Sequence, residues 1–213
     1  MVRLILLHFS LFLLPLCAWA QGKADPYIKE ADRHFEQMAY ARAIESYLGA
    51  TELGAVNEHV TKRLADCYMR LGKSDQAEKW YAMVVKFLNR EPREMYNYAE
   101  ALKSNGKYVE AEEWMDRYLA ATDSGDGTRR SNINGFARNF LSTPDRFIVR
   151  PVSVNTTFSD FGTAWLGSSQ VVFSSARQVT TGIERRAAWN DQPFLDLFVA
   201  EVTPNGDLVN ARP

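Results

Sequence analysis

The spacing of apolar and polar residues changes once along the chain, close to Phe147. Across residues 24–122, apolar residues recur with the period of an α-helix, about 3.6 residues. After Phe147, the period falls to about two in short runs separated by turn residues. These runs are "FIVRPVSVN", "GTAWLG", "QVVFSSAR" and "FLDLFVAEV". The pattern predicts a multidomain α+β protein, with helices over residues 24–122 and strands over residues 148–213.

The helical part contains an internal repeat of 34 residues. Each unit has two alanines, followed by a large residue four positions after the second alanine. Small residues let two antiparallel helices approach closely, and large residues fill the space between them, so each unit predicts a helical hairpin. The alanines are Ala31, Ala65 and Ala99, then Ala43, Ala77 and Ala111, and the large residues are Tyr47, Tyr81 and Met115.

This repeat resembles the tetratricopeptide repeat, and three such repeats form a short superhelix. Gly72 and Gly106 fall where the first helix of a repeat must end and the chain must reverse. The first repeat departs from the pattern, because Met38 occupies the glycine position and His34 stands where a tyrosine is usual. We therefore expect an irregular terminal repeat.

In the tetratricopeptide family, the exposed face of the first helices lines a groove that binds peptides or partner domains. The resemblance places a partner-binding groove on that face here, with a modest basic clamp at Lys62, Arg63 and Arg70. Two other interpretations stay open: an ordinary solvated face, and a face that packs on the chain's own second domain. The groove residues are Asp32, Phe35, Lys62, Arg63, Asp66, Met69, Arg70, Tyr96, Asn97, Glu100 and Lys103, and Ile28 and Glu36 lie on the same face.

The first twenty residues have the order of a secretory signal peptide. One cation, Arg3, precedes an apolar run that ends at Leu16, and Ala18-Trp19-Ala20 supplies a small-x-small cleavage site. We expect residues 1–20 to be removed, which leaves an exported chain without a transmembrane helix. Lipidation of Cys17 is the alternative, but the preceding Leu14-Pro15-Leu16 lacks the small residue that such processing requires. After cleavage Cys67 is the only cysteine, so no internal disulfide is expected.

Residues 123–147 are rich in Gly, Ser, Asn and Asp and form the predicted linker. Within it, residues 132–141 predict a short helix that caps the last repeat with four apolar side chains. Asp123 and Asp126 hint at calcium, but the alternating oxygen ligands and closing glutamate of a calcium loop are missing, which favours a plain loop. We expect no metal and no cofactor. The capping residues are Ile133, Phe136, Phe140 and Leu141.

The strand-rich part resembles the first blade of WD40-like periplasmic β-propellers. The resemblance rests on "SDFGTAWLGSSQVVFSSAR" followed by "WNDQPFLDLFVAEV". Residues 167–169 predict a hairpin loop and residues 204–207 a turn. We expect Arg177 and Asp196, on neighbouring strands, to pair and help to set the register.

The complete order of leader, three repeats, linker and first blade is similar to OmpA-family envelope proteins of the Bacteroidetes, including PorE-type components of the type IX secretion machinery. Members of that family continue through a full propeller to an OmpA-like domain that binds peptidoglycan. Four strands cannot close a ring of blades, so residues 148–213 predict an incomplete propeller. We therefore expect the sequence to be a fragment of a longer protein. The resemblance implies a non-catalytic scaffold of the periplasm and outer membrane whose partners are envelope or secretion-complex proteins.

Composition and motifs exclude several other functions. The formal net charge of −1 over 213 residues does not favour nucleic acid. Hydrolase, zinc-protease and nucleotide-binding motifs are absent from the sequence, so no catalytic function is expected. His34 reads as a packed side chain, and four carboxylates that occur in pairs read as solvated charges. These are Glu112 with Glu113, and Asp191 with Asp196.

One alternative function stays open, that of a surface lipoprotein that binds glycans or nutrients. Trp165, Trp189 and Tyr96 have side chains that could stack on sugars. The favoured interpretation of these three aromatics is that they belong to the cores of the two domains.

Overall fold

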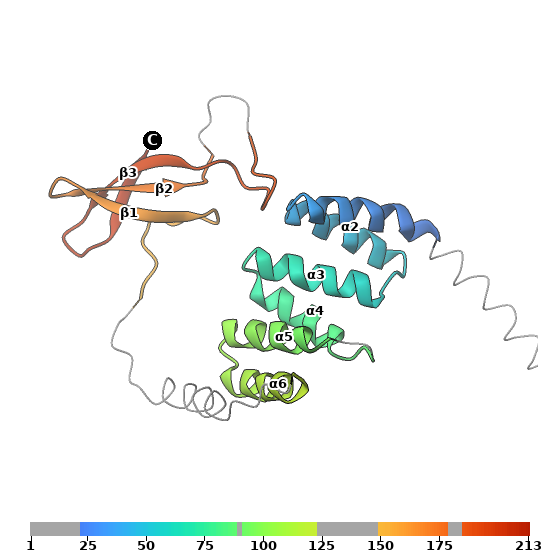
Figure 1. The fold of residues 1–213 in the computed structure, drawn as a ribbon. Helices are drawn as coiled ribbons and strands as arrows, with labels where there is room; N and C mark the ends of the chain where they lie inside the picture. Colours follow the sequence, from blue (N-terminus) through green and yellow to red (C-terminus); the bar gives the residue numbers. More distant parts are fainter. Residues whose placement is uncertain (1–21, 89–90, 123–148, 179–184) are drawn as a thin grey trace, which may run out of the picture. The chain divides into compact units, whose positions relative to one another are not determined.

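The computed structural model describes residues 22–88, 91–122, 149–178 and 185–213 (Figure 1). The chain divides into a helical unit, Met1–Thr143, and a sheet unit, Pro144–Pro213. The predicted signal peptide, the capping helix at residues 132–141 and the Asp123–Asp126 pair lie outside the described residues.

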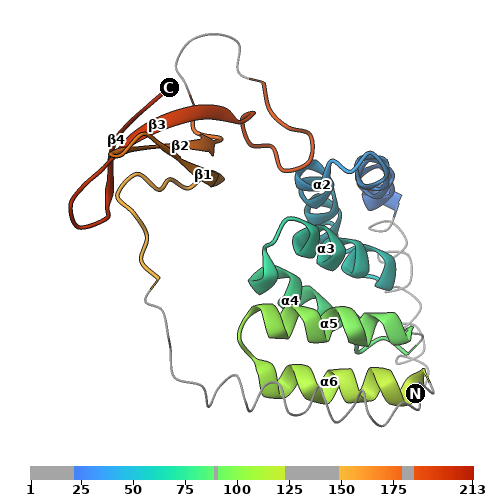
Figure 2. The same ribbon diagram turned by 60° about the vertical axis from the view of Figure 1, so that its left-hand side comes forward.

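The helical unit is an array of antiparallel hairpins, which Figures 1 and 2 show as successive layers. A helix over residues 22–36 pairs with α2, α3 pairs with α4, and α5 pairs with α6. This confirms the three predicted hairpins and gives an array like that of tetratricopeptide repeats. The helices with printed bounds are α2 (Tyr40–Glu52), α3 (Glu58–Arg70), α4 (Ser74–Val84), α5 (Pro92–Ser104) and α6 (Tyr108–Ala121).

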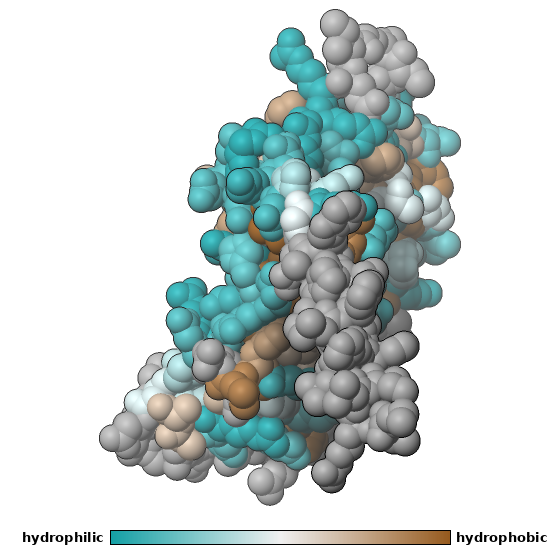
Figure 3. Space-filling view, turned by 90° about the vertical axis from the view of Figure 1, so that its right-hand side faces the viewer, coloured by the Kyte–Doolittle hydropathy of each residue, from teal (hydrophilic) through white to brown (hydrophobic). Residues whose placement is uncertain are grey.

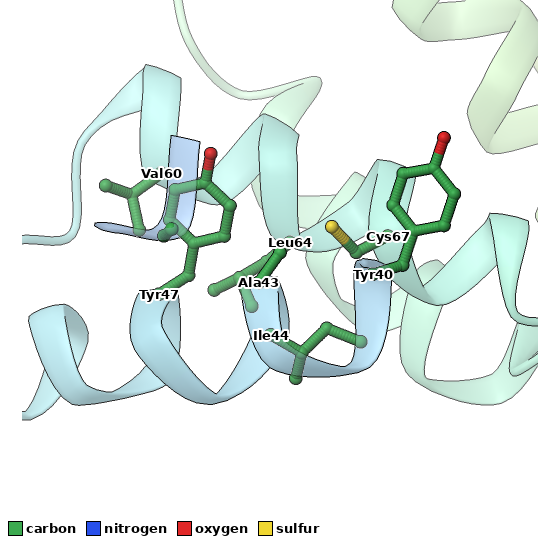
Figure 4. Packing of buried hydrophobic residues seen from close by; sticks show 8 residues of the cluster. Tyr40, Ala43, Ile44, Tyr47, Val60, Leu64 and Cys67 are labelled. Carbon is green, nitrogen blue, oxygen red and sulfur yellow. The ribbon is translucent and has the colours of Figure 1, made fainter. Parts of the chain in front are cut away.

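The small and large residues of the repeat occupy the expected positions. All six repeat alanines are buried, as are Tyr47 and Tyr81, and this burial lets the helices of each hairpin lie close together. Figure 4 shows Tyr47 and Ala43 of α2 against Leu64 and Cys67 of α3, so one core joins neighbouring hairpins. Cys67 is completely buried, and this burial raises the pKa of its thiol to about 12.

The turn within each hairpin requires a left-handed residue, as the glycines predict. Gly72 and Gly106 have φ of 69° and 75°. Met38 takes φ of 58° at the matching position, so the first repeat keeps the same turn although its residue is unfavourable there. His34 is half-buried and packs as expected, with its Nε2 3.0 Å from Glu30 Oε1.

The sheet unit is a four-stranded antiparallel meander in the order β1-β2-β3-β4. Residues 167–169 connect β1 to β2, and residues 203–207 form the turn before β4, as predicted. "FIVRPVSVN" is not a strand over its described residues 149–155. Pro151 cannot donate a backbone hydrogen bond, and Ser153 instead binds the Asp207 carboxylate through its amide at 2.8 Å. The strands are β1 (Asp160–Leu166), β2 (Gln170–Ser175), β3 (Asp196–Val202) and β4 (Leu208–Arg212).

One face of the sheet carries the core of this unit. Phe173 and Phe198 lie directly opposite each other on β2 and β3, with ring centroids 5.9 Å apart. Val154, from the segment that precedes β1, packs against the same cluster. The guanidinium of Arg177 lies about equally far from both rings, 5.1 Å and 4.9 Å from their centroids. The core is therefore closed by an aliphatic side chain and a stacked cation.

The predicted pair between Arg177 and Asp196 is wrong. Asp160 and Asp196 flank Ser175 on its two neighbouring strands, but Arg177 binds Asp160, with a distance of 3.0 Å. Asp196 is exposed, whereas Asp160 is half-buried. Burial opposes ionisation of Asp160, but hydrogen bonds from Ser175, Arg177 and Thr156 outweigh it and lower the pKa of Asp160 to about 2.

Across the four described ranges, the helices are all too short or too polar to span a bilayer.

Candidate partner-binding groove

A hydrogen bond that recurs with the 34-residue period ties the groove face to the second helices. Tyr47 donates its hydroxyl to Asp32, and Tyr81 donates to Asp66 at 2.6 Å. The tyrosines come from α2 and α4, and the aspartates come from the first helices of the same repeats. Burial, reinforced by the adjacent carboxylate, raises the pKa of both tyrosines far above the usual value. These hydroxyls stay protonated and act as donors rather than as acids or nucleophiles.

The third repeat lacks this bond. Glu100 and Met115 stand at the positions that correspond to Asp66 and Tyr81, and a methionine side chain has no hydroxyl to donate. Glu100 instead lies 3.6 Å from Lys103 on its own helix. The tyrosine–aspartate bond thus ties the predicted groove face to the second helices in the first two repeats, and the described residues of the third make no equivalent bond.

His59 also belongs to the predicted groove face, on which the repeat pattern did not place it. Its Nε2 lies 2.7 Å from Asp32 Oδ1, so α3 is linked to the first helix of the preceding repeat. The residue lies about one helical turn before Lys62 and Arg63, and this spacing would have placed it on the same face. The contact joins consecutive repeats, whereas the tyrosine bonds join helices within a repeat.

The three predicted clamp residues have different surroundings. Lys62 Nζ is 2.7 Å from Glu94 Oε1, and the side chain of Glu94 is only 2% exposed. Glu94 also closes the capping box of α5 by accepting a hydrogen bond from the backbone of Glu91 at 3.0 Å. Lys62 therefore neutralises a buried carboxylate, which gives it a structural role.

Arg63 and Arg70 lie over aromatic rings of the first hairpin. The guanidinium of Arg63 is 4.0 Å from the centroid of the Phe35 ring, and that of Arg70 is 5.3 Å from the centroid of Tyr40. Stacking uses the flat face of a guanidinium and leaves its N–H edge available. Neither arginine makes an ion pair with another described residue. The two cations are seven residues apart on α3 and so share one helix face.

The remaining predicted groove residues lie mainly on α5. Tyr96 is 40% exposed, and its ring lies 5.4 Å from that of Tyr118. Asn97 lies near the hydroxyl of Tyr81, whose hydrogen-bond partner is Asp66, and opposes the rise in the pKa of Tyr81. Met69 packs against the buried cluster around Tyr81. The structure thus brings Asp66, Asn97 and Met69 together around one tyrosine, and Tyr96 stays accessible.

One prediction about carboxylates needs correction. Glu113 is exposed as expected, but one oxygen of Glu112 is buried and has no hydrogen-bond partner among the described residues. Glu112 is 34 residues after Glu78, whose carboxylate accepts bonds of 2.7 Å from both Asn105 and Lys107 of the next repeat. Glu112 is therefore buried because it occupies the repeat position of Glu78, and it is not a solvated surface charge.

The three candidate sugar-stacking aromatics do not belong to a core. Trp165 and Trp189 are 68% and 44% exposed in the sheet unit, and Tyr96 is accessible in the helical unit. Burial fails for Trp165 because β1 is an edge strand. Figure 3 shows one face of the molecule, where hydrophilic residues predominate among those described and the hydrophobic ones are scattered.

The residues of the predicted groove face offer contacts for binding. Cys67 is a buried thiol with a raised pKa, and the groove tyrosines are held protonated. Among the residues that the structure describes, His, Cys, Asp and Glu do not gather in groups of three or more that could hold a metal ion. The chemistry that the groove offers is hydrogen bonding, stacking and cation–carboxylate contact.

Comparisons with known proteins give only distant similarity. The sequence matches no family model and no curated protein.

Three solved tetratricopeptide domains resemble the structure. The first domain of Spaghetti (RPAP3), bound to the HSP90 peptide SRMEEVD, has 20% identity and a TM-score of 0.45, and the match covers 58% of this chain and 96% of that one. The OM64 domain from Arabidopsis has 15% identity and a TM-score of 0.45, with coverage of 57% and 98%. The Sgt2 domain from Aspergillus fumigatus has 14% identity and a TM-score of 0.43, with coverage of 62% and 92%. The assignment of the repeats rests on the 34-residue period and on the helical hairpins of this chain.

Proposed function

We propose that the helical unit is a protein-binding module whose groove holds an extended, acidic segment of a partner. The observation that carries this proposal is the arrangement of Arg63 and Arg70, whose guanidinium groups stack on aromatic rings. Stacking fixes the orientation of each guanidinium before a ligand arrives, and so reduces the entropy lost on binding. The planar N–H edge suits bidentate contact with a carboxylate.

Two acidic residues of the groove face, Asp32 and Asp66, already have partners within the protein. Asp32 accepts bonds from Tyr47 and His59, and Asp66 accepts one from Tyr81. Burial raises the pKa of Asp66, although Lys62, Arg63 and Arg70 act against that shift. Because Lys62 is paired with Glu94, Arg63 and Arg70 are the cations of α3 that favour an acidic ligand.

The test is a pull-down from solubilised cell envelopes with an Arg63→Glu/Arg70→Glu variant as bait. We expect loss of the bound partners, because both cation sites become repulsive to carboxylates. Lys62 is left unchanged, since its replacement would leave the buried Glu94 carboxylate without a counter-charge.

The matched control is a variant with a charge change of the same kind on a second helix, Arg42→Glu at an exposed site of α2. It should retain the wild-type partners. Circular dichroism must show that all the variants remain folded. An unchanged partner set for the double variant would rule out the groove as the binding site.

We further propose that this module acts in the cell envelope, as part of a non-catalytic scaffold. The leader-like residues 1–20 support export, and the blade-like residues 158–196 support kinship with OmpA-family envelope proteins. In such a protein, a peptidoglycan-binding domain outside this sequence would anchor the scaffold and link it to an outer-membrane or secretion complex. N-terminal sequencing of the exported chain should give Gln21 as the first residue, and cytoplasmic retention of an uncleaved chain would contradict export.

The alternative of a glycan-binding lipoprotein rests on the exposure of Trp165, Trp189 and Tyr96. It requires a lipid on Cys17 and a rise in melting temperature when a glycan is added. A mature N-terminus at Gln21, together with an unchanged melting temperature across a glycan panel, would exclude this function.

A further inference from the structure

Among the described strands, β1 has an outward edge with which no other strand pairs. β1 lies at one side of the sheet, and six of its seven residues are exposed. An edge strand presents a row of backbone donors and acceptors that another strand can use. Among the exposed residues are three large apolar side chains, which are Phe161, Trp165 and Leu166.

The opposite edge of the sheet is different. β4 has five residues, and Asn210 within it takes a left-handed φ of 55°. Its pairing with β3 shifts register between Val199 and Glu201, and Arg212 adds a charge. An irregular backbone and charged side chains are the features by which proteins prevent strand addition. β1 also has an irregularity, near Gly162, but Ala164, Trp165 and Leu166 beyond it pair in unbroken register with β2. In β4 only Leu208 and Val209 pair in unbroken register with β3, so β4 is the poorer template.

The charges around β1 favour a second copy of the same chain as the added strand. Asp160 is the only charged residue of β1, and Arg177 neutralises it at 3.0 Å. Two β1 edges can thus meet without opposing like charges, and each brings apolar side chains to the other. A two-fold axis makes such a pair antiparallel and self-complementary.

We propose that β1 pairs with β1 of a second copy and so joins two four-stranded sheets into one continuous sheet. The pairing consumes the β1 edge of both copies, and the irregular β4 edges at the two ends resist further addition. The expected product is a closed dimer rather than a filament.

Sedimentation equilibrium of the purified protein tests this proposal over a wide range of protein concentration. The wild-type mass should approach twice that of one chain. A Thr163→Lys/Trp165→Lys variant, which places two charges on the edge, should sediment with the mass of one chain at the same concentrations. Hydrogen exchange in residues 160–166 of the wild type should slow as concentration rises.

Leu197→Lys is the matched control, because Leu197 is 67% exposed on the central strand β3 rather than at an edge. It should leave the dimer intact. A wild-type monomer at every concentration would overturn the proposal, and so would a dimer that survives the edge variant but not Leu197→Lys. A different result would be that hydrogen exchange in residues 160–166 slows only when another protein is added, whatever the concentration of this chain. That result would assign the edge to a strand of the other protein and would overturn pairing between copies.

Discussion

The tyrosines of the second helices are buried, and each has a polar hydroxyl group at its end. An aspartate partner satisfies the hydrogen-bonding capacity of that hydroxyl. A buried hydroxyl without a partner is costly, so the bond of Tyr81 to Asp66 both satisfies the tyrosine and orients a groove carboxylate. The 34-residue period reproduces this arrangement at Tyr47 and Asp32. A large aromatic side chain was readable from the sequence at both positions. Its polar partner was not, since the two residues of each pair are 15 positions apart on different helices.

Replacing Tyr81 by Phe should reduce the stability of the helical unit by about 1–2 kcal/mol. The change removes one donor and leaves the partly buried Asp66 carboxylate without it. Urea denaturation followed by circular dichroism measures the loss. Tyr27→Phe is the control, because Tyr27 is 48% exposed. Equal stability of the two variants would show that the recurring bond contributes nothing.

Asp160 should make the sheet unit sensitive to acid. Its pKa is lowered from 3.8 to about 2, so the folded unit holds the ionised form more strongly than the unfolded chain does. The resulting stabilisation is complete above about pH 4 and is lost as the pH falls toward 2. The free energy of unfolding of Asp160→Asn should therefore differ from that of the wild type at pH 6 and approach it near pH 2. A difference that is independent of pH would contradict the assignment.

At the scale of elements, the contact between Lys62 and Glu94 connects α3 to the beginning of α5. Glu94 has two tasks, because it caps α5 and accepts the Lys62 ammonium at 2.7 Å. Its burial is not apparent from the sequence, where a glutamate near a helix start predicts only a cap. The sequence placed Lys62 correctly on α3, but the partner of this side chain depends on how consecutive hairpins pack.

Lys62→Met should destabilise the helical unit by about 2–4 kcal/mol, because it leaves a buried carboxylate unpaired. Glu94→Gln should cost less, since the amide keeps an acceptor for the backbone of Glu91. The double variant should be more stable than the sum of the two single effects predicts. A double-mutant cycle from chemical denaturation measures this coupling, and additivity within about 0.3–0.5 kcal/mol would show that the pair is not coupled.

The sequence predicted elements well where one residue type has one structural consequence. Repeated alanines fixed the hairpin contacts, and Gly72 and Gly106 marked the turns. It failed where two partners competed. Arg177 had an aspartate on each side of Ser175, and the hydrogen bonds from Thr156 and Ser175 that favour Asp160 depend on tertiary structure. The groove face followed from the period, but the stacking of Arg63 and Arg70 on aromatic rings did not.

At the scale of the whole molecule, each unit has a core of its own. The clusters around Tyr47 and Tyr81 belong to the helical unit, and the cluster around Phe173 and Phe198 belongs to the sheet unit. The described clusters share no residue between units. Each unit can therefore be destabilised selectively by a change in its own core.

Phe173→Ala should cost the sheet unit about 3–5 kcal/mol, through lost burial and the cavity that remains. We expect the backbone amides of β2 and β3 to lose their protection from hydrogen exchange at a lower temperature, while far-ultraviolet helical ellipticity keeps its wild-type transition. Leu64→Ala should have the reverse effect, because Leu64 is fully buried in the helical core. A parallel shift of both transitions by either variant would indicate that the two units unfold together.

The buried position of Cys67 makes it possible to time how often the helical array opens. Burial removes the thiol from solvent and raises its pKa to about 12, so alkylating reagents meet almost no thiolate while the hairpins are closed. Modification must wait until α2 and α3 separate, and its rate at saturating reagent is then the opening rate itself. The modification rate of Cys67 thus measures how often the helical repeats open. A ligand that bridges the first two hairpins would slow it in proportion to its occupancy.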